Sequence, residues 1–358
     1  MSMDTTAQQL AGSALRSLRR LNPLGRAKVA PQRHVRVLAG IDSLTAGGGN
    51  PVSSYIPSLT SRLKRRLGDG GPGLVWFDAL QPGFYNGATS GTVTPFLVGN
   101  PAWDSGPRSH SLCGLGTSYV GVAGGYAGLD PGVAWDRCRI YFELGAGGSF
   151  GVVSAGDGAT GASVDGARYP TGELCAVDIY QDGVAATGIA VFSITGNVVL
   201  FGADFLRDSG GATLSNCGIS GTYLSQHASL DDAWGRKWME MLRPDVYLLN
   251  GGMNDRVTLD DGGYGHLIDK LVGRWQSGGT QVMLVRPNDS SDAGSTFLAR
   301  YDRVLKGVAI ARGCGYLDDR DTLGAYAAAV AAGFMADTVH PNAAGNGRRA
   351  AAYDKALF

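Results

Sequence analysis

A long glycine-rich stretch with short strand-like runs interrupts a regular alternation of predicted strands and helices. Between Lys64 and Lys237 the sequence contains no lysine, and the apolar runs in its second half are short and separated by glycine. On either side of this stretch, apolar runs typical of buried strands alternate with segments of helical periodicity. The chain is therefore expected to contain an α/β domain with an antiparallel β module inserted into it.

The α/β part is predicted to have about five parallel strands covered by helices on both faces, a three-layer α/β/α architecture. The predicted strands are residues 35–39, 212–216, 246–250, 282–285 and 316–318. The predicted helices are residues 53–67, 224–242, 267–275, 296–311, 323–335 and 343–357. This α/β domain is expected to be discontinuous, with residues 34–94 before the insertion and residues 209–358 after it.

The insertion, residues 95–208, is predicted to be an all-β sandwich. Its clearest strand runs are residues 139–144, 150–154, 174–180, 189–195 and 198–205. Gly196-Asn197 separates the last two runs, and such a pair favours a two-residue hairpin turn. Glycine contributes 56 of the 358 residues, which fits many tight turns between short strands.

Residues 1–33 are predicted to form a basic N-terminal arm. The first 36 residues contain seven lysine or arginine residues and one aspartate, although the whole chain has no net charge. Leu10, Ala14, Leu18 and Leu21 recur at helical spacing. No apolar stretch follows Arg19-Arg20, so no export signal is predicted, and the arm either docks to a larger assembly or is a solvated tail.

Composition excludes several other classes of function. A neutral chain lacks the basic excess that nucleic-acid binding requires, and no run of 18 apolar residues is present to span a membrane. Five cysteines are scattered without a Cys-x-x-Cys pair, so neither a zinc site nor a redox motif is expected, and buried thiols are predicted. The acidic run 318–321 is interrupted by Arg320 and is expected to be a solvated loop and helix cap.

Four polar segments follow predicted strands or precede the last helix. They are residues 40–47 (GIDSLTAG), 216–221 (NCGISG), 251–255 (GGMND) and 337–341 (DTVHP). Open α/β sheets place their ligands at the carboxyl ends of their strands, where the first three segments lie. Together the four supply a hydroxyl group, backbone N–H groups, a carboxamide, an imidazole and a carboxylate, the set that acyl transfer requires.

These four segments resemble, in the same order, the sequence blocks of the SGNH or GDSL-type hydrolase family. The resemblance implies a flavodoxin-like α/β/α fold with Ser43 as nucleophile, His340 as general base and Asp337 as the residue that orients the histidine. It also implies an oxyanion hole made by the N–H groups of Ser43 and Gly221 and the carboxamide of Asn254. Asp42 and Asp255 are expected to hold loops by local hydrogen bonds, and neither a cofactor nor a metal is expected.

Some family members with carbohydrate esterase activity carry a jelly-roll-like module at the same place, which suggests an acetylated glycan as substrate. Two alternatives remain open: a lipid or thioester hydrolase of the same fold, and a carbohydrate-binding adhesin resembling a phage-tail component. Five aromatic residues in and beside the insertion either stack on sugars or form its core, and the core is favoured for most of them: Trp103, Tyr119, Tyr126, Trp135 and Tyr141.

Overall fold

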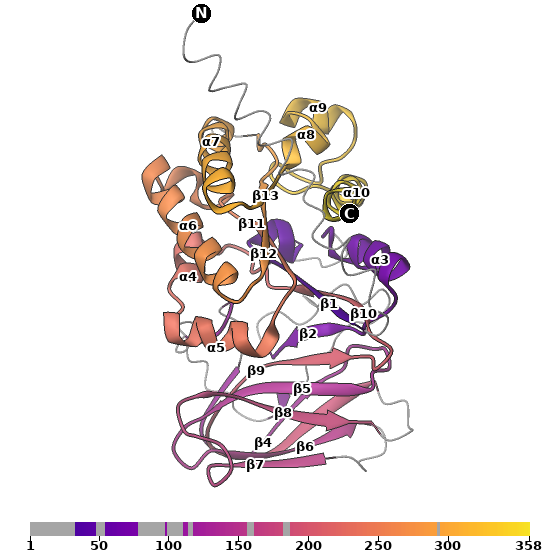
Figure 1. The fold of residues 1–358 in the computed structure, drawn as a ribbon, viewed down its shortest axis with the longest axis vertical. Helices are drawn as coiled ribbons and strands as arrows, with labels where there is room; N and C mark the ends of the chain where they lie inside the picture. The colour runs from indigo at the N-terminus through magenta and orange to yellow at the C-terminus, as the bar shows by residue number, and fades with distance from the viewer. Residues whose placement is uncertain are drawn as a thin grey trace, which may run out of the picture.

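The computed structural model describes residues 33–47, 54–77, 97–98, 110–113, 117–155, 161–181, 187–291 and 294–358. The predicted basic arm, Arg33 excepted, and Trp103 lie outside these residues. Figure 1 shows a part that consists of helices around a sheet and, beside it, a part made of long antiparallel strands. The predicted division of the chain at residues 95 and 209 remains a proposal.

A parallel sheet forms the centre of the α/β part. Within the described residues it has five strands in the order β10-β1-β11-β12-β13, and every neighbouring pair is parallel. The strands are β1 (His34–Ile41), β10 (Gly211–Asn216), β11 (Val246–Asn250), β12 (Gln281–Arg286) and β13 (Gly315–Asp318). All five predicted strands are confirmed. Ile41 is in register with Asn250, and Ala39 with Asn216, so the loops that follow β1, β10 and β11 leave from one edge of the sheet.

Helices cover both faces of this sheet because its strands carry apolar side chains on both sides. Val37 and Ala39 pack with α3 (Ile56–Leu67) and α10 (Ala343–Leu357), whereas Leu38 and Ile41 face the opposite core. That second core includes apolar side chains of α5 (Asp232–Leu242), α6 (Asp261–Ser277) and α7 (Gly294–Arg312). Figure 1 shows α3 and α10 on one side of the sheet and α5, α6 and α7 on the other, as the predicted three layers require.

Short helices complete the α/β part, and two of the predicted helices are divided. Residues 224–242 form α4 (Leu224–Ala228) and α5, because Asp231 caps a new helix by accepting hydrogen bonds from two backbone N–H groups, those of Ala233 and Trp234. Residues 323–335 do not form one helix either. Gly324, with φ of +92°, ends α8 (Asp319–Leu323), and α9 (Tyr326–Ala331) follows. The remaining short elements are α2 (Ser43–Ala46) and the 3₁₀ helix Asp255–Val257.

The other part is an antiparallel β module, which confirms the predicted fold class. Eight strands within the described residues are linked by hydrogen bonds into one sheet. They are β2 (Gly73–Trp76), β3 (Leu97–Val98), β4 (Thr117–Leu129), β5 (Arg137–Leu144), β6 (Ser149–Ala155), β7 (Gly161–Asp165), β8 (Leu174–Tyr180) and β9 (Gly188–Leu206). β9 pairs with β4 on one edge, and with β6 and then β5 on the other.

The predicted hairpin at Gly196-Asn197 is wrong, because β9 continues through this pair as a single strand of 19 residues. Gly196 has φ of +62° and bends the strand. The connection between β5 and β6 lies against this bend: the N–H of Gly145 donates to the carbonyl of Asn197 at 2.8 Å. A Cβ atom on Gly196 would lie 2.3 Å from the carbonyl oxygen of Gly147. Gly196 therefore lets β9 bend and lets the connection between β5 and β6 pack against it, and it does not form a hairpin turn.

The two parts meet through a continuous apolar core. Trp238 of α5 is fully buried against Trp76 of β2, Tyr141 of β5 and Phe201 of β9, with ring centroids 5.2–6.0 Å apart. β2 lies before residue 95 and nevertheless pairs with β9, so the antiparallel sheet begins earlier in the chain than the predicted insertion. Trp135 and Tyr141 are also core residues, as predicted.

All five cysteines are buried, and none forms a disulfide. Among the described helices, none combines the length and the hydropathy that crossing a membrane would require.

Candidate active site

Ser43 lies where β1 ends and the short helix α2 begins. The preceding residue, Asp42, caps this helix: one carboxylate oxygen accepts the N–H of Leu44 at 3.0 Å and the other accepts the N–H of Met253 at 3.3 Å. Asp42 thereby ties the serine turn to the loop after β11. Its side chain is buried, and the burial raises the pKa of Asp42 to about 6 even though both hydrogen bonds lower it.

His340 lies beside Ser43, although 297 positions separate them in the sequence. The Nε2 atom of His340 is 2.9 Å from the Oγ atom of Ser43. The Nδ1 atom of the same ring is 2.9 Å from a carboxylate oxygen of Asp337. The structure thus brings the three predicted catalytic side chains together in the order Asp337, His340, Ser43.

Asp337 also shapes the loop that carries the histidine. Its second carboxylate oxygen accepts the backbone N–H groups of Val339, at 2.7 Å, and His340, at 2.6 Å. Partial burial alone would raise the pKa of Asp337, but these hydrogen bonds and the imidazole outweigh burial and hold the pKa below its usual value. The carboxylate therefore stays ionised at neutral pH, when it faces the imidazole.

The loop after β12 supports the histidine loop from another side. Asn288 donates its side-chain N–H to the carbonyl of Val339 at 2.9 Å, and the N–H of Ser291 donates to the carbonyl of Thr338 at 2.9 Å. These contacts were missed from the sequence, because an Asn-Asp-Ser stretch after a strand indicates only a turn. Their role in supporting the histidine loop follows only from the three-dimensional structure, in which the loop after β12 lies beside the loop before α10.

Gly221 and Asn254, the other two residues predicted for the oxyanion hole, lie on neighbouring loops. Gly221 is exposed and has φ of +78°, a conformation that favours glycine. The side-chain N–H of Asn254 donates to the carbonyl of Thr222, the residue after Gly221, at 2.9 Å. Asn254 therefore contacts the Gly221 loop, and one of its carboxamide hydrogens is engaged there.

Further hydrogen bonds lock these loops together. Asp255 accepts the N–H of Leu224 at 3.2 Å, and the hydroxyl of Thr222 donates to the carbonyl of Ile41 at 3.3 Å. Asp255 is a loop-holding residue, as the sequence predicts, and its burial raises its pKa to about 6. The buried His227, for which no role is predicted from the sequence, lies with Nε2 3.0 Å from the hydroxyl of Thr222.

The acidic run 318–321 is only partly the solvated cap that the sequence predicts. Asp318 caps α8 by accepting the N–H of Arg320 at 2.8 Å. Asp319, in contrast, is fully buried and forms an ion pair with Arg349 at 2.8 Å, so the solvated assignment is wrong for this residue. Among the described residues, no group of three or more His, Cys, Asp or Glu side chains is arranged to hold a metal ion.

Residues 195–348 match the model of the GDSL-like lipase/acylhydrolase family, and this range contains Asp337 and His340. This part of the chain belongs to the GDSL-like lipase/acylhydrolase family. Ser43 and β1 precede the matched range, but they join this GDSL-like hydrolase through the sheet and the hydrogen bonds described above.

Two solved structures illustrate what this GDSL-like hydrolase is similar to. A peptidoglycan O-acetylesterase is similar over 97% of this chain and 94% of its own, with a TM-score of 0.70 and 18% sequence identity. An acetylxylan esterase from Geobacillus stearothermophilus covers 41% of this chain and 73% of its own, with 21% identity and a TM-score of 0.34. A comparison with curated protein sequences finds no match.

Proposed function

We propose that this GDSL-like hydrolase cleaves small acyl esters, with O-acetyl groups on a carbohydrate as its substrate and Ser43 as its nucleophile. The observation that carries the proposal is the hydrogen-bonded series from Asp337 through His340 to Ser43, in which both contacts measure 2.9 Å. A serine hydroxyl becomes a nucleophile when an adjacent base removes its proton, and a third group that orients the base completes the arrangement.

In the first half of the proposed reaction, Nε2 of His340 takes the proton from Oγ of Ser43 as this oxygen attacks the ester carbonyl. The carbonyl oxygen becomes an oxyanion, which the N–H groups of Ser43 and Gly221 and the carboxamide of Asn254 stabilise. The intermediate then collapses, the bond to the sugar oxygen breaks, and His340 donates its proton to the departing hydroxyl. An acetyl group remains on Ser43.

In the second half, a water molecule attacks the acetyl carbonyl while His340 accepts a proton from that water. Collapse releases acetate and returns the proton to Ser43. Asp337 holds Nδ1 of His340 throughout, so that Nε2 carries the lone pair at the start of each half-reaction and the imidazolium is stabilised in between. Each proton taken by His340 is given back within the same half-reaction, and no other co-reactant is needed.

Two observations support a small acyl group on a carbohydrate. Ser43 is only 7% exposed, which favours a compact acyl group over a long chain at the nucleophile. The chain is also similar over 97% of its length, antiparallel module included, to a structure described as a peptidoglycan O-acetylesterase. The module lies next to the site, because Trp76 of β2 donates its indole N–H to the carbonyl of Asn216, directly before the Gly221 loop.

The function is tested by measuring acetate release from a panel of acetylated polysaccharides, including peptidoglycan, with the wild-type protein and the Ser43→Ala variant. We expect release from at least one glycan by the wild type and none above background by the variant. Nitrophenyl esters of increasing chain length serve as a second series, in which acetate should be preferred. Preference for long acyl chains would favour a lipid hydrolase, and glycan binding without any turnover would favour the adhesin alternative.

For Asn254, the expected effect is kinetic. Asn254→Ala should lower kcat by about 10²–10³ with little change in KM, because an oxyanion donor acts mainly in the transition state. The measurement is steady-state hydrolysis of nitrophenyl acetate. Asn254 also donates to the Thr222 carbonyl, so thermal unfolding of the variant must be measured beside it. A raised KM with unchanged kcat would assign Asn254 to substrate binding instead.

A further inference from the structure

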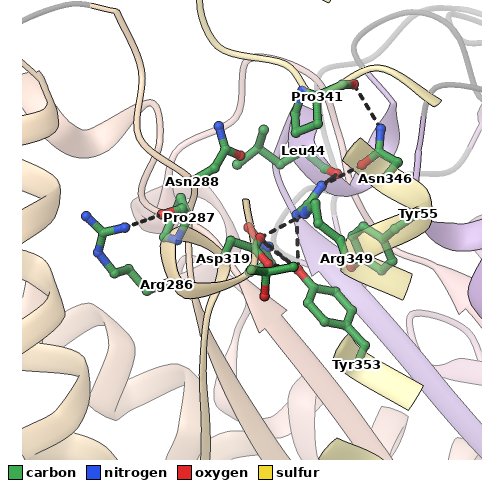
Figure 2. A network of polar contacts seen from close by, with 12 residues as sticks. Leu44, Tyr55, Arg286, Pro287, Asn288, Asp319, Pro341, Asn346, Arg349 and Tyr353 are labelled. Carbon is green, nitrogen blue, oxygen red and sulfur yellow. Dashed lines mark hydrogen bonds and ion pairs between the residues drawn. The ribbon is translucent and has the colours of Figure 1, made fainter. Parts of the chain in front are cut away.

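A fully buried ion pair lies directly behind the candidate active site. Arg349 of α10 and Asp319 of α8 both have no exposed side-chain surface, and Nε of Arg349 is 2.8 Å from a carboxylate oxygen of Asp319. Figure 2 shows this pair at the centre of a polar network that reaches α2 and the loop before α10. None of the proposed chemical steps involves either residue.

Arg349 contacts the serine turn through the carbonyl group of Leu44, the residue after Ser43. The distance from Nη1 to this carbonyl oxygen is 3.1 Å. Because α2 is only four residues long, its last carbonyl groups find few partners within the helix. Arg349 supplies such a partner, and the Tyr55 ring lies 4.7 Å from the guanidinium carbon on another side. The position of the serine turn is thus coupled to the position of α10.

The same nitrogen of Arg349 also reaches the histidine loop through one intermediary. Nη1 donates to the side-chain oxygen of Asn346 at 2.9 Å. The side-chain N–H of Asn346 donates in turn to the carbonyl of Pro341, the residue after His340, at 2.9 Å. A chain of three hydrogen bonds therefore joins the residue after the serine to the residue after the histidine, as Figure 2 shows.

Asp319 holds Arg349, the central residue of these three hydrogen bonds, in place. It accepts the hydroxyl of Tyr353 at 2.8 Å and the side-chain N–H of Asn250 at 3.3 Å, in addition to the contact with Arg349. Asn250 ends β11, immediately before the loop that carries Asn254. The buried carboxylate of Asp319 thus holds the guanidinium group of Arg349 at the end of the central sheet. These contacts fix the direction in which its N–H groups point.

Burying two charges gives little net stability, because the loss of hydration offsets most of their attraction. A guanidinium differs from an ammonium in offering several N–H groups in a fixed planar fork. Here that fork makes simultaneous contacts to Asp319, Leu44, Asn346 and Tyr353. An arrangement that fixes directions but contributes little net stability is suited to setting the distance between two loops.

We propose that Arg349 and Asn346 are positioning residues that set the distance between Oγ of Ser43 and Nε2 of His340. Neither residue touches the substrate, and both act through backbone carbonyl groups next to the reacting side chains. The kinetic part of this inference rests on the proposed function, because it requires Ser43 and His340 to act together. The geometric part does not, and it has a separate readout below.

The first test is Asn346→Ala, which leaves the Arg349–Asp319 pair in place and removes the link to Pro341. We expect kcat to fall by about ten- to a hundredfold with KM changed less than about twofold, since a displaced catalytic group costs rate and not ground-state binding. The matched control is Asp354→Ala on the same helix. Asp354 pairs with Arg66 at 2.8 Å and is not part of the link to Pro341. The control should lower the melting temperature without this loss of kcat.

Arg349→Lys provides a second variant, which keeps a cation beside Asp319 but loses the fork. It should lower kcat at least as far as Asn346→Ala does. If it does not fold, Asn346→Ala decides the test. The proposal is overturned if Asn346→Ala keeps full kcat per folded molecule, or if its kcat loss is matched by that of Asp354→Ala at an equal fall in melting temperature.

A readout independent of turnover separates this inference from the proposed function. In nitrogen-15 NMR, the Nε2 resonance of His340, assigned by its loss in His340→Gln, should shift when Ser43 becomes alanine in the wild-type background, because Oγ of Ser43 lies 2.9 Å from Nε2. The same Ser43→Ala change should produce little or no shift in the Asn346→Ala background, because the two side chains are no longer held in contact. An undiminished shift would overturn the positioning role even in a protein without esterase activity, whereas a lost shift would support it.

Discussion

Asp337→Asn is expected to lower kcat by about 10⁴. Asparagine keeps an oxygen for the N–H groups of Val339 and His340, so the loop should hold its shape. The amide N–H₂ would instead face Nδ1 of His340, which then becomes the acceptor and moves the ring proton to Nε2. A protonated Nε2 cannot take the proton of Ser43.

The measurement is kcat on nitrophenyl acetate at neutral pH, where Asp337 is ionised in the wild type. Circular dichroism and thermal unfolding of the variant should match the wild type, since the hydrogen bonds of the loop are kept. The side chain of Asp337 is 54% exposed, so water has access to the pair. A loss smaller than about tenfold would show that solvent replaces the carboxylate and that the orienting role is minor.

The largest expected effect on stability comes from Trp238→Ala, at the junction of the two parts. Removing a fully buried tryptophan typically lowers the free energy of unfolding by about 3–5 kcal/mol. Here the side chain also donates its indole N–H to the carbonyl of His110 at 2.8 Å. Urea unfolding monitored by circular dichroism measures the change. Trp234→Ala, one turn earlier on α5, is the matched control, because that ring is only partly buried and should cost less.

The same contacts predict what happens if residues 95–208 are replaced by a short linker. β2 would lose β9, and Trp238 would lose Tyr141 and Phe201. We therefore expect the shortened chain to be unfolded, so point variants are needed to study the module. A folded, two-state shortened protein, or a loss below about 1 kcal/mol in Trp238→Ala, would show that the α/β part does not depend on this junction.

The parallel sheet and the candidate site could be predicted from the sequence for one physical reason. Strands buried on both faces are continuous apolar runs, and their carboxyl ends meet at one edge of the sheet. The polar residues after the runs at 35–39 and 246–250 therefore had to converge, and Asp42 and Met253 are in contact. The roles of Ser43, His340 and Asp337 in turnover remain proposals, although their side chains lie within hydrogen-bond distance of one another.

Other features depend on contacts that no local pattern contains. Gly196-Asn197 fits a hairpin turn and a strand bend equally well, and the loop between β5 and β6 decides between them. β2, with four residues, is too short for its period to be recognised. Asp319 stands in a run that resembles a solvated helix start, and its burial follows only from the packing of α10 behind α2. Sequence reasoning missed Arg349 for the same reason.

The strand order also determines the order in which the parallel sheet can assemble while the chain leaves the ribosome. β1 is made first, but both of its hydrogen-bonded neighbours, β10 and β11, are made only after the antiparallel module. Until Asn250 has been synthesised, β1 is an apolar strand without its full set of partners, a state in which nascent chains are prone to aggregation. Contacts between distant residues form slowly, because a long loop must first close. The contact between Ser43 and His340 can form only after all five strands of the described parallel sheet have been made.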